Sequence, residues 1–260
     1  MKTVILAGGL GTRISEENND GPKPMIKIGG QPIIWHIMKL YSSFGHNDFV
    51  ICSGHKKEYI RDYFTRAIIG TEDMTFDFSG ENKIIAHQKH SHIENWRVTL
   101  ADTGEESQTG SRVRKIRKYI DSERFFLTYG DGVSDVDINA LLKKHEDSGK
   151  TVTITAVQPG NRFGVLDITE DDTICGFREK PKDDGVWING GFMVAELDLF
   201  DVIPDGDSCI LEREPLEKLG ASGKLGAYRH NGFWHCMDTP RDKAVLENLW
   251  RDGTAPWKVW

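Results

Sequence analysis

Cysteine is scarce in this chain of 260 residues, and its four copies stand far apart: Cys52, Cys175, Cys209 and Cys236. Because no two of them have Cys-x-x-Cys spacing, the sequence argues against a zinc motif and a disulfide framework. No apolar run approaches the ~18 residues that a membrane-spanning helix needs. The start of the chain also lacks the pattern of a signal peptide, because a short strand and a glycine loop follow at once. We therefore expect a cytoplasmic protein with reduced thiols and no membrane partner.

Basic residues are also fewer than acidic ones. The chain has 33 Lys and Arg against 40 Asp and Glu, which gives a net charge of −7, and its pI is about 5.7. This balance argues against nucleic acid as a partner, since proteins that bind it carry a basic surface. Any anionic ligand must be held by a local group of basic side chains. The sequence contains no internal repeat or low-complexity tract, and its length suits one large domain or two closely joined ones.

What the chain does have is a glycine loop near its start. An apolar run at 4–6 predicts a buried strand, and Gly8, Gly9 and Gly11 follow it within a few residues. Glycine lets the backbone approach a ligand closely, and the N–H groups of such a loop suit phosphate oxygens. Arg13 adds a cationic fork that matches phosphate, and Lys23, between two prolines, adds a second cation. By itself, however, the loop is better explained as a tight turn with one surface arginine.

Two familiar phosphate-binding motifs do not fit this loop. A P-loop needs Gly-Lys-Ser or Gly-Lys-Thr, whereas Gly11 is followed by Thr12 and Arg13. A dinucleotide-binding fingerprint needs a third glycine where Ile14 stands. If the loop binds phosphate, it therefore belongs to another class of site.

Hydrophobic periodicity predicts alternating strands and helices in the first part of the chain. Helices are expected over 31–44 and 56–69, and strands over 4–6 and 49–52. This alternation is typical of an α/β protein, in which helices cover both faces of a parallel sheet and ligands bind beyond the carboxyl ends of its strands. The other elements expected are short hairpin strands over 75–78, 84–88 and 97–100, a strand over 152–157, and helices over 112–120, 137–145, 212–219 and 242–250.

Three polar features have both a structural and a functional explanation. The segment 102–112 is either a flexible surface loop or a lid that reads a nucleobase. The apolar run that begins at Phe125 predicts a buried strand, and Asp131 follows it between two glycines, so Asp131 forms either a turn or a ligand for Mg²⁺ held against phosphates. Asp238 is either the N-cap of the last helix, a role that Thr239 could also fill, or a second acid of the site. Spacing alone leaves these alternatives open.

Seven motifs, taken in order, resemble the signature of the sugar-phosphate nucleotidylyltransferases, enzymes that join a nucleoside triphosphate to a sugar 1-phosphate. They are Leu-Ala-Gly-Gly-Leu-Gly-Thr-Arg at 6–13, Lys-Pro at 23, Gly-Asp-Gly at 130, Arg-Phe-Gly at 162, Glu-Lys-Pro at 179, Asn-Gly-Gly at 189 and Trp-x-x-Met-Asp-Thr at 234. The resemblance covers nearly the whole chain. Within the family, segments 102–112, 127–135, 232–243 and 255–260 are similar to the branch that makes CDP-glucose.

The resemblance implies a single α/β domain with a Rossmann-like mixed, mostly parallel sheet flanked by helices, plus small β-hairpin insertions. A nucleotide-binding half would span 1–135 and a sugar-phosphate-binding half 136–260. The implied reaction transfers CMP from CTP to α-D-glucose 1-phosphate, uses Mg²⁺, and feeds deoxysugar and O-antigen synthesis. A homo-oligomer is usual in the family. Two alternatives remain: a uridylyl- or thymidylyltransferase for a related sugar 1-phosphate, and a non-catalytic nucleotide-sugar sensor on the same fold.

The resemblance also assigns roles to individual positions. Those assigned to the nucleotide are Leu6, Ala7, Gly8, Gly9, Leu10, Gly11, Thr12, Arg13, Lys23, Ser107, Arg112 and Gly130. Those assigned to the sugar phosphate are Gly164, Glu179, Lys180, Asn189 and Gly190, and those assigned to the metal are Asp131 and Asp238. The expected catalytic residues are Arg13, Lys23, Asp131, Lys180 and Asp238. Because the attacking phosphate oxygen is already anionic, we expect positioning and charge neutralisation rather than a general base.

Overall fold

The computed structural model describes residues 1–9, 21–69, 73–80, 83–87, 94–158, 164–168, 174–179 and 187–260. In residues 68, 69, 86, 164–168 and 174–179 it describes the backbone alone. The centre of the described chain is a seven-stranded sheet whose strand order is β14-β10-β13-β8-β1-β4-β7. In that order its strands span Leu225–His230, Val152–Val157, Ile188–Glu196, Arg124–Tyr129, Lys2–Leu6, Asp48–Ser53 and Arg97–Asp102.

The sheet is mixed but mostly parallel. β13 runs antiparallel to both of its neighbours, β8 and β10, whereas the other neighbouring strands pair in parallel. β1 lies inside the sheet between β8 and β4, and all five of its residues are buried. An apolar run buried on both sides is what a central parallel strand requires. The predicted α/β class with a mostly parallel sheet is confirmed.

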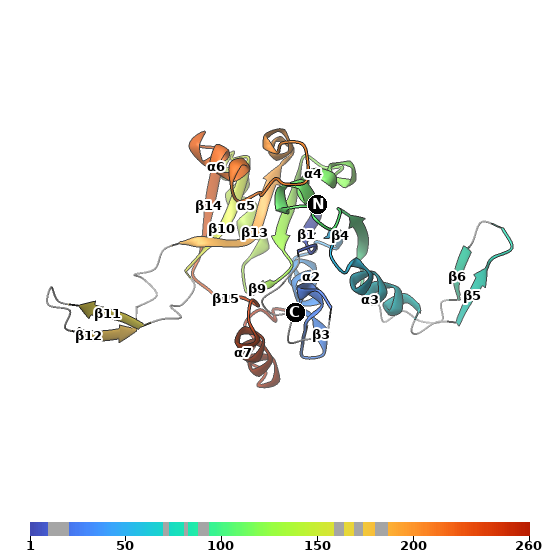
Figure 1. Ribbon diagram of the computed structural model, residues 1–260, viewed down its shortest axis with the longest axis horizontal. Helices are drawn as coiled ribbons and strands as arrows, with labels where there is room; N and C mark the ends of the chain where they lie inside the picture. The colour runs from blue at the N-terminus through green and yellow to red at the C-terminus, as the bar shows by residue number, and fades with distance from the viewer. Residues whose placement is uncertain are drawn as a thin grey trace.

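Helices cover both faces of this sheet (Figure 1). The helices are α2 Ile33–Ser43, α3 Lys57–Ile69, α4 Thr109–Lys115, α5 Ile138–Ser148, α6 Glu214–Ala221 and α7 Pro240–Arg251. Alternate residues of β1 point to opposite faces, as the pleat of a strand demands. Ile5 packs in one core with side chains of α2, α3, α5 and α7, and Val4 and Leu6 pack in a second core with side chains of α4 and α6.

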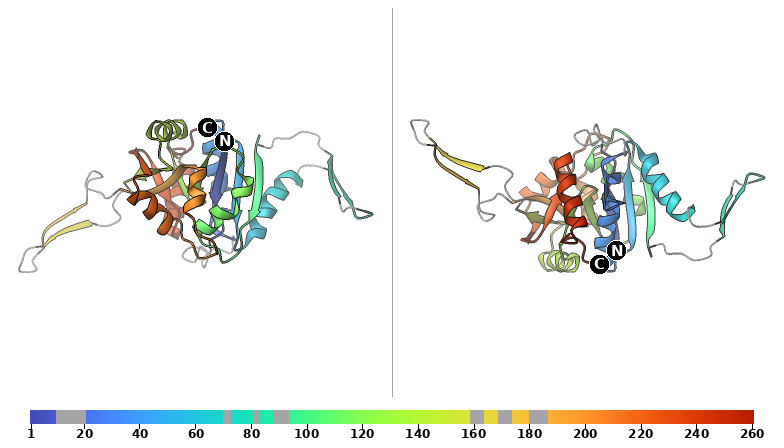
Figure 2. Two further views of the ribbon diagram at one scale, coloured as in Figure 1. Left: turned by 90° about the horizontal axis from the view of Figure 1, so that it is seen from above. Right: turned by 90° about the horizontal axis from the view of Figure 1, so that it is seen from below.

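Four short two-stranded ladders complete the described chain. Two of them, β5 Asp73–Asp77 with β6 Lys83–His87 and β11 Gly164–Ile168 with β12 Ile174–Glu179, extend from opposite sides of the sheet (Figures 1 and 2). The third joins β2 Lys27–Ile28 to β3 Gln31–Pro32. The fourth pairs β9 Gly132–Ser134 with β15 Trp234–Cys236. This last ladder brings a segment near the end of the chain to the carboxyl end of β8.

Most expected elements are present, and two were placed wrongly. The strand expected over 97–100 was assigned to a hairpin, but β7 is the edge strand of the central sheet and runs parallel to β4. The helix expected over 112–120 begins earlier, at Thr109, ends at Lys115, and is followed by a 3-10 turn, Arg117–Tyr119. None of the helices in the described part of the chain is long and apolar enough to cross a membrane. Cys52 and Cys209 are free, buried thiols.

Candidate active site

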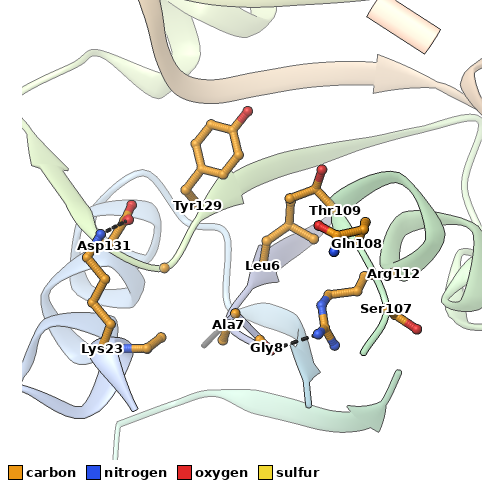
Figure 3. Close-up of a pocket in the computed structure, with 13 residues that line it drawn as sticks. Leu6, Ala7, Gly8, Lys23, Ser107, Gln108, Thr109, Arg112, Tyr129 and Asp131 are labelled. Atoms are coloured by element: carbon orange, nitrogen blue, oxygen red, sulfur yellow. Dashed lines mark hydrogen bonds and ion pairs between the residues drawn. The ribbon is translucent and has the colours of Figure 1, made fainter. Parts of the chain in front are cut away.

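A cavity of about 240 Å³ opens at the carboxyl ends of β1 and β8, where the sequence placed the ligand (Figure 3). Its walls are Leu6, Ala7, Gly8, Gly9, Lys23, Pro24, Ser107, Gln108, Thr109, Arg112, Tyr129, Gly130 and Asp131. Eight of the twelve positions assigned to the nucleotide are therefore part of it. The other four, Leu10, Gly11, Thr12 and Arg13, lie outside the described residues.

The start of the glycine loop is held in place by backbone hydrogen bonds to neighbouring strands. Ala7 N donates to Cys52 O at 3.0 Å, and Gly130 N donates to Leu6 O at 3.0 Å. Gly8 must be glycine for a reason that its sequence context did not show. A Cβ there would lie 2.3 Å from Arg112 Nη1, whereas Gly9 has open space around it. The glycine at position 8 thus makes room for a buried guanidinium.

That guanidinium connects the loop to the rest of the sheet. Arg112 is 3% exposed, and burial lowers its pKa from the ordinary value. Its Nη2 donates to Gly8 O at 2.7 Å, and its Nη1 donates to Gly104 O and Thr103 Oγ1, both at 2.7 Å. A planar guanidinium with several fixed N–H donors can donate hydrogen bonds to several oxygen acceptors at once. Arg112 therefore positions the start of the phosphate loop while its side chain lines the cavity.

The segment 102–112 is a surface loop only in part: Asp102, Glu105, Glu106 and Gln108 are exposed, whereas Thr103, Ser107 and residues 110–112 are buried. Ser107 is 6% exposed, and its Oγ lies 2.7 Å from both Thr103 O and Asp207 Oδ1. Backbone bonds also join the segment to the chain before α6: Gln108 N donates to Asp207 O at 2.8 Å, and Gly110 N donates to Cys209 O at 3.0 Å. No local pattern predicts this contact, because Ser107 and Asp207 are 100 residues apart.

The two acids assigned to the metal meet at one cation. Lys23 Nζ donates to Asp131 Oδ2 at 2.5 Å and also to Asp238 Oδ1. The Lys23 side chain is 14% exposed, and those of Asp131 and Asp238 are 31% and 34% exposed. Burial alone would lower the pKa of Lys23, but the two carboxylates outweigh it and raise that pKa above its ordinary value. The structure thus brings Asp131 and Asp238, the two acids assigned to one metal, together around Lys23, which the sequence had assigned to the nucleotide phosphates.

The β9–β15 ladder explains how residues so far apart in sequence come together. Its register pairs Gly132 with Cys236, and Met237 N donates to Asp131 O at 2.8 Å. Asp131 therefore immediately precedes one strand of the ladder, and Asp238 follows the other by two residues. Asp238 does not cap α7. Thr239 does, in a capping box in which Thr239 Oγ1 accepts from Asp242 N and Asp242 accepts from Thr239 N.

Of the positions assigned to the sugar phosphate, Asn189 contacts a residue of the cavity wall. Asn189 Nδ2 donates to Tyr129 OH at 3.0 Å, and Tyr129 lines the cavity. Gly190 packs so closely on β10 that a Cβ would lie 2.8 Å from Val157 Cγ1. In the β11–β12 ladder, Gly164 is the register partner of Glu179, so these two assigned positions are neighbours. Lys180 lies outside the described residues.

The sequence assigned no role to four residues that line the cavity, Pro24, Gln108, Thr109 and Tyr129, or to Glu212, which supports its wall. Tyr129 OH donates to Glu212 Oε1 at 2.6 Å, and Thr109 Oγ1 donates to Glu212 Oε2 at 2.6 Å. Tyr129 could have been found, since it ends the strand that leads into Gly-Asp-Gly. Glu212 carries no local signal, because its partners stand 83 and 103 residues earlier in the chain.

Comparison with known proteins identifies the family of the chain. Residues 2–204 match the family described as nucleotidyl transferase, and the chain belongs to that family. It is 51% identical over 261 residues to glucose-1-phosphate cytidylyltransferase from Salmonella typhi, with 100% of both chains covered. The enzyme of the same name from Salmonella typhimurium strain LT2 shows the same identity and coverage.

Solved structures share the fold. HddC from Yersinia pseudotuberculosis superposes with a TM-score of 0.68 at 24% identity, over 96% of this chain and 99% of that one. An inositol-1-phosphate CTP transferase from T. maritima gives a TM-score of 0.64 at 16% identity, over 100% of this chain and 97% of that one. At such identities the likeness concerns the fold alone.

Proposed function

We propose that the protein transfers CMP from CTP to α-D-glucose 1-phosphate, giving CDP-glucose and pyrophosphate. The observation that carries the proposal is the meeting of Lys23, Asp131 and Asp238 beside a glycine-loop cavity. Half of all positions are identical to those of a full-length glucose-1-phosphate cytidylyltransferase, which supports the choice of both substrates. The product would feed deoxysugar and O-antigen synthesis, and the site would work in the cytoplasm.

The residues present fit a divalent metal. Asp131 and Asp238 direct one carboxylate oxygen each to the same ammonium group, so they converge on a single cation position. Mg²⁺ is commonly held by one or two carboxylates together with substrate phosphates. Among the described residues no group of three or more His, Cys, Asp and Glu forms a cage of protein ligands, which suits a metal that arrives with its nucleotide. When bound there, Mg²⁺ would neutralise phosphate charge and hold the triphosphate in line for attack.

The chain's own groups would do the remaining work by binding and orientation. The N–H groups of the loop at Gly8 and Gly9, with Arg13 beyond them, would hold the triphosphate. Lys23 would leave its carboxylates for a phosphate oxygen, and Lys180 would neutralise the attacking sugar phosphate. Bringing two polyanions together in line is the main barrier to such a transfer, so positioned cations are sufficient chemistry.

The remaining assignments follow the same division. Residues 1–135 would form the nucleotide-binding half, with Ser107 and Arg112 supporting the wall beside the base, and residues 136–260 the sugar-phosphate half. In the second half, Gly164, Glu179, Asn189 and Gly190 would contact glucose 1-phosphate. Tyr129, near the end of the first half, contacts Glu212 and Asn189 of the second half.

We also propose that the protein is a homo-oligomer. The β5–β6 hairpin exposes Phe76, Phe78, Ile84 and Ile85 by 52%, 80%, 61% and 46%. Phe76 and Ile84 are cross-strand partners, so their side chains lie on the same face of the ladder. An isolated two-stranded hairpin is marginally stable, and grouped apolar side chains indicate a contact surface. A second copy of the chain covering this face would bury Phe76 and Ile84.

The test is a substrate panel. Purified protein with Mg²⁺ is assayed for pyrophosphate release with CTP, UTP, dTTP and GTP against several sugar 1-phosphates. We expect CTP with glucose 1-phosphate to exceed the other nucleotides by at least tenfold in kcat/KM, because polar groups left unpaired by the wrong base are costly. Activity should disappear with a chelator and return with Mg²⁺. Equal rates with UTP would overturn the cytidine assignment, and no transfer with any pair would overturn the enzymatic one.

A further inference from the structure

The Glu212 carboxylate lies behind the cavity wall and contacts two of the residues that form it. Thr109 and Tyr129 line the cavity, and each donates its hydroxyl hydrogen to one oxygen of Glu212 at 2.6 Å. The two come from different elements: Thr109 begins α4, on the side of segment 102–112, and Tyr129 ends β8. One half-buried side chain therefore links two walls that the sequence alone does not connect.

The chemistry of these bonds fixes their direction. An ionised carboxylate can only accept hydrogen bonds, so both hydroxyls must donate to Glu212. The Tyr129 oxygen is then left to accept from Asn189 Nδ2, which lies 3.0 Å away. Asn189 Oδ1 accepts from Gly191 N at 2.9 Å, and because a backbone N–H can only donate, the orientation of the amide is set at both ends. One Nδ2 hydrogen of Asn189 remains beyond these bonds and can serve a ligand.

The backbone around Asn189 is shaped for this contact. Gly191 has a φ of 77°, and Phe192, which is not glycine, has a φ of 41°. Positive φ at a bulky residue is strained and is kept where the surrounding structure demands it. Phe192 N donates to Thr128 Oγ1 at 3.3 Å, next to Tyr129. The positive φ values at Gly191 and Phe192 bend the strand beside Asn189, whose amide lies against the Tyr129 hydroxyl.

We propose that Glu212 is a positioning residue that sets both walls of the cavity, through Thr109 on the nucleotide side and through Tyr129 and Asn189 on the sugar side. The inference rests on the proposed function for the assignment of the two sides. Hydrogen bonds to an ionised partner are stronger than bonds between neutral groups, so the Glu212 carboxylate holds the Thr109 and Tyr129 hydroxyls firmly in place.

Three variants separate the two branches, with Glu214→Gln on the exposed first turn of α6 as a matched control. Tyr129→Phe removes the sugar branch and keeps Glu212 bound to Thr109. Thr109→Val removes the nucleotide branch and keeps Glu212 bound to Tyr129. Glu212→Gln weakens both, because an amide offers one acceptor oxygen where the carboxylate offers two. KM for each substrate, kcat and Tm are measured with the nucleotide and sugar phosphate that the wild type uses best.

We expect Tyr129→Phe to raise KM for the sugar phosphate roughly tenfold and to leave KM for the nucleotide unchanged. We expect Thr109→Val to raise KM for the nucleotide by a similar factor and to leave KM for the sugar phosphate unchanged. Effects of this size are reasonable because small misplacements at such sites reduce rates by up to ~100-fold. Glu212→Gln should raise both KM values, and Glu214→Gln neither. If Glu212→Gln does not fold, Tyr129→Phe and Thr109→Val still test the positioning role, because each is expected to raise KM for a different substrate. A lower Tm with both KM values unchanged in all three variants would show a structural brace only and overturn the inference. A wild type inactive with every substrate pair would instead overturn the proposed function.

Discussion

Asp238 and Thr239 are neighbours in the chain with separate roles. Thr239 and Asp242 close a capping box at the start of α7, while the Asp238 carboxylate binds Lys23 beside the cavity. From the sequence alone either residue could cap the helix. The structure separates the two roles, so one substitution at each position tests stability and activity independently.

We expect Asp238→Asn to lose most turnover, at least 100-fold, with little change in stability, because the cap of α7 remains and only the cation-binding oxygen is replaced. Thr239→Ala should lower the free energy of unfolding by about 1 kcal/mol, the usual value of an N-cap, with most turnover retained. Urea unfolding and steady-state kinetics on both variants check this. Near-normal turnover of Asp238→Asn at low Mg²⁺ would rule out Asp238 as a metal ligand.

The glycine loop shows how one residue can meet two demands. Gly8 was expected to bring the backbone close to a phosphate, and it does line the cavity. The structure adds that the space beside its Cα is filled by Arg112, whose guanidinium is bonded to the loop carbonyl at 2.7 Å. A side chain at position 8 would therefore displace the group that holds the loop, and the two demands cannot be met by any residue with a Cβ.

At the scale of elements, α2, α7 and the end of the chain are joined by an aromatic cluster around His36. His36 is fully buried and makes edge-on contacts with the rings of Trp35, Trp250 and Trp257. Its Nε2 lies 2.8 Å from Ile28 O, and Trp257 Nε1 donates to its Nδ1 at 3.3 Å. The neutral tautomer with hydrogen on Nε2 satisfies both contacts. A protonated ring would place a second hydrogen against the Trp257 N–H.

This cluster should make stability depend on pH. Burial, opposed by backbone hydrogen bonds and by Glu247, lowers the pKa of His36 to about 4. Because the unfolded chain binds a proton near pH 6.5 and the folded one does not, the stabilisation is complete above that pH and is lost as pH falls towards 4. From pH 7 to pH 5 the wild type should lose about 2 kcal/mol more of its free energy of unfolding than His36→Gln.

Urea unfolding at the two pH values, followed by tryptophan fluorescence, measures that difference. His46 and His145 also have pKa values lowered by burial, so the wild type alone cannot assign the effect. The comparison with His36→Gln removes their contribution, since both proteins keep them. Equal losses in the two proteins would show that His36 is not the group responsible.

At the scale of the whole molecule, the β5–β6 hairpin exposes apolar side chains that a monomer would leave in water. We expect the double variant Phe76→Ser, Ile84→Ser to shift the protein towards the monomer in analytical ultracentrifugation, because both side chains lie on the face assigned to the second copy. Val245→Ser, at a 38% exposed apolar position of α7, is the matched control and should leave the assembly unchanged. A wild type that is monomeric at micromolar concentration would contradict the proposed oligomer.

The sequence by itself determined the elements and the chemical class of the site. Periodicity of 3.6 predicted α2, α3 and α7 to within a few residues, and the apolar runs before the glycine loop and before Asp131 predicted β1 and β8. These signals are local, because each helix or strand must bury one face of its own segment. The glycine loop, Lys23 and Asp131 were found in the same way, since each follows or adjoins a predicted element.

Only the tertiary structure decided which distant segments touch. The contact of Lys23 with Asp238, 215 residues away, depends on the β9–β15 ladder. Ser107 is bound to Asp207 before α6, Arg112 is bound to the glycine loop and to β4, and the place of β7 depends on its pairing with β4. Nothing in the spacing of a chain records such pairings, because they come from packing and hydrogen bonding between segments that the fold brings together. Glu212 is the clearest case: an ordinary glutamate in sequence, it becomes the shared partner of two cavity walls only after folding.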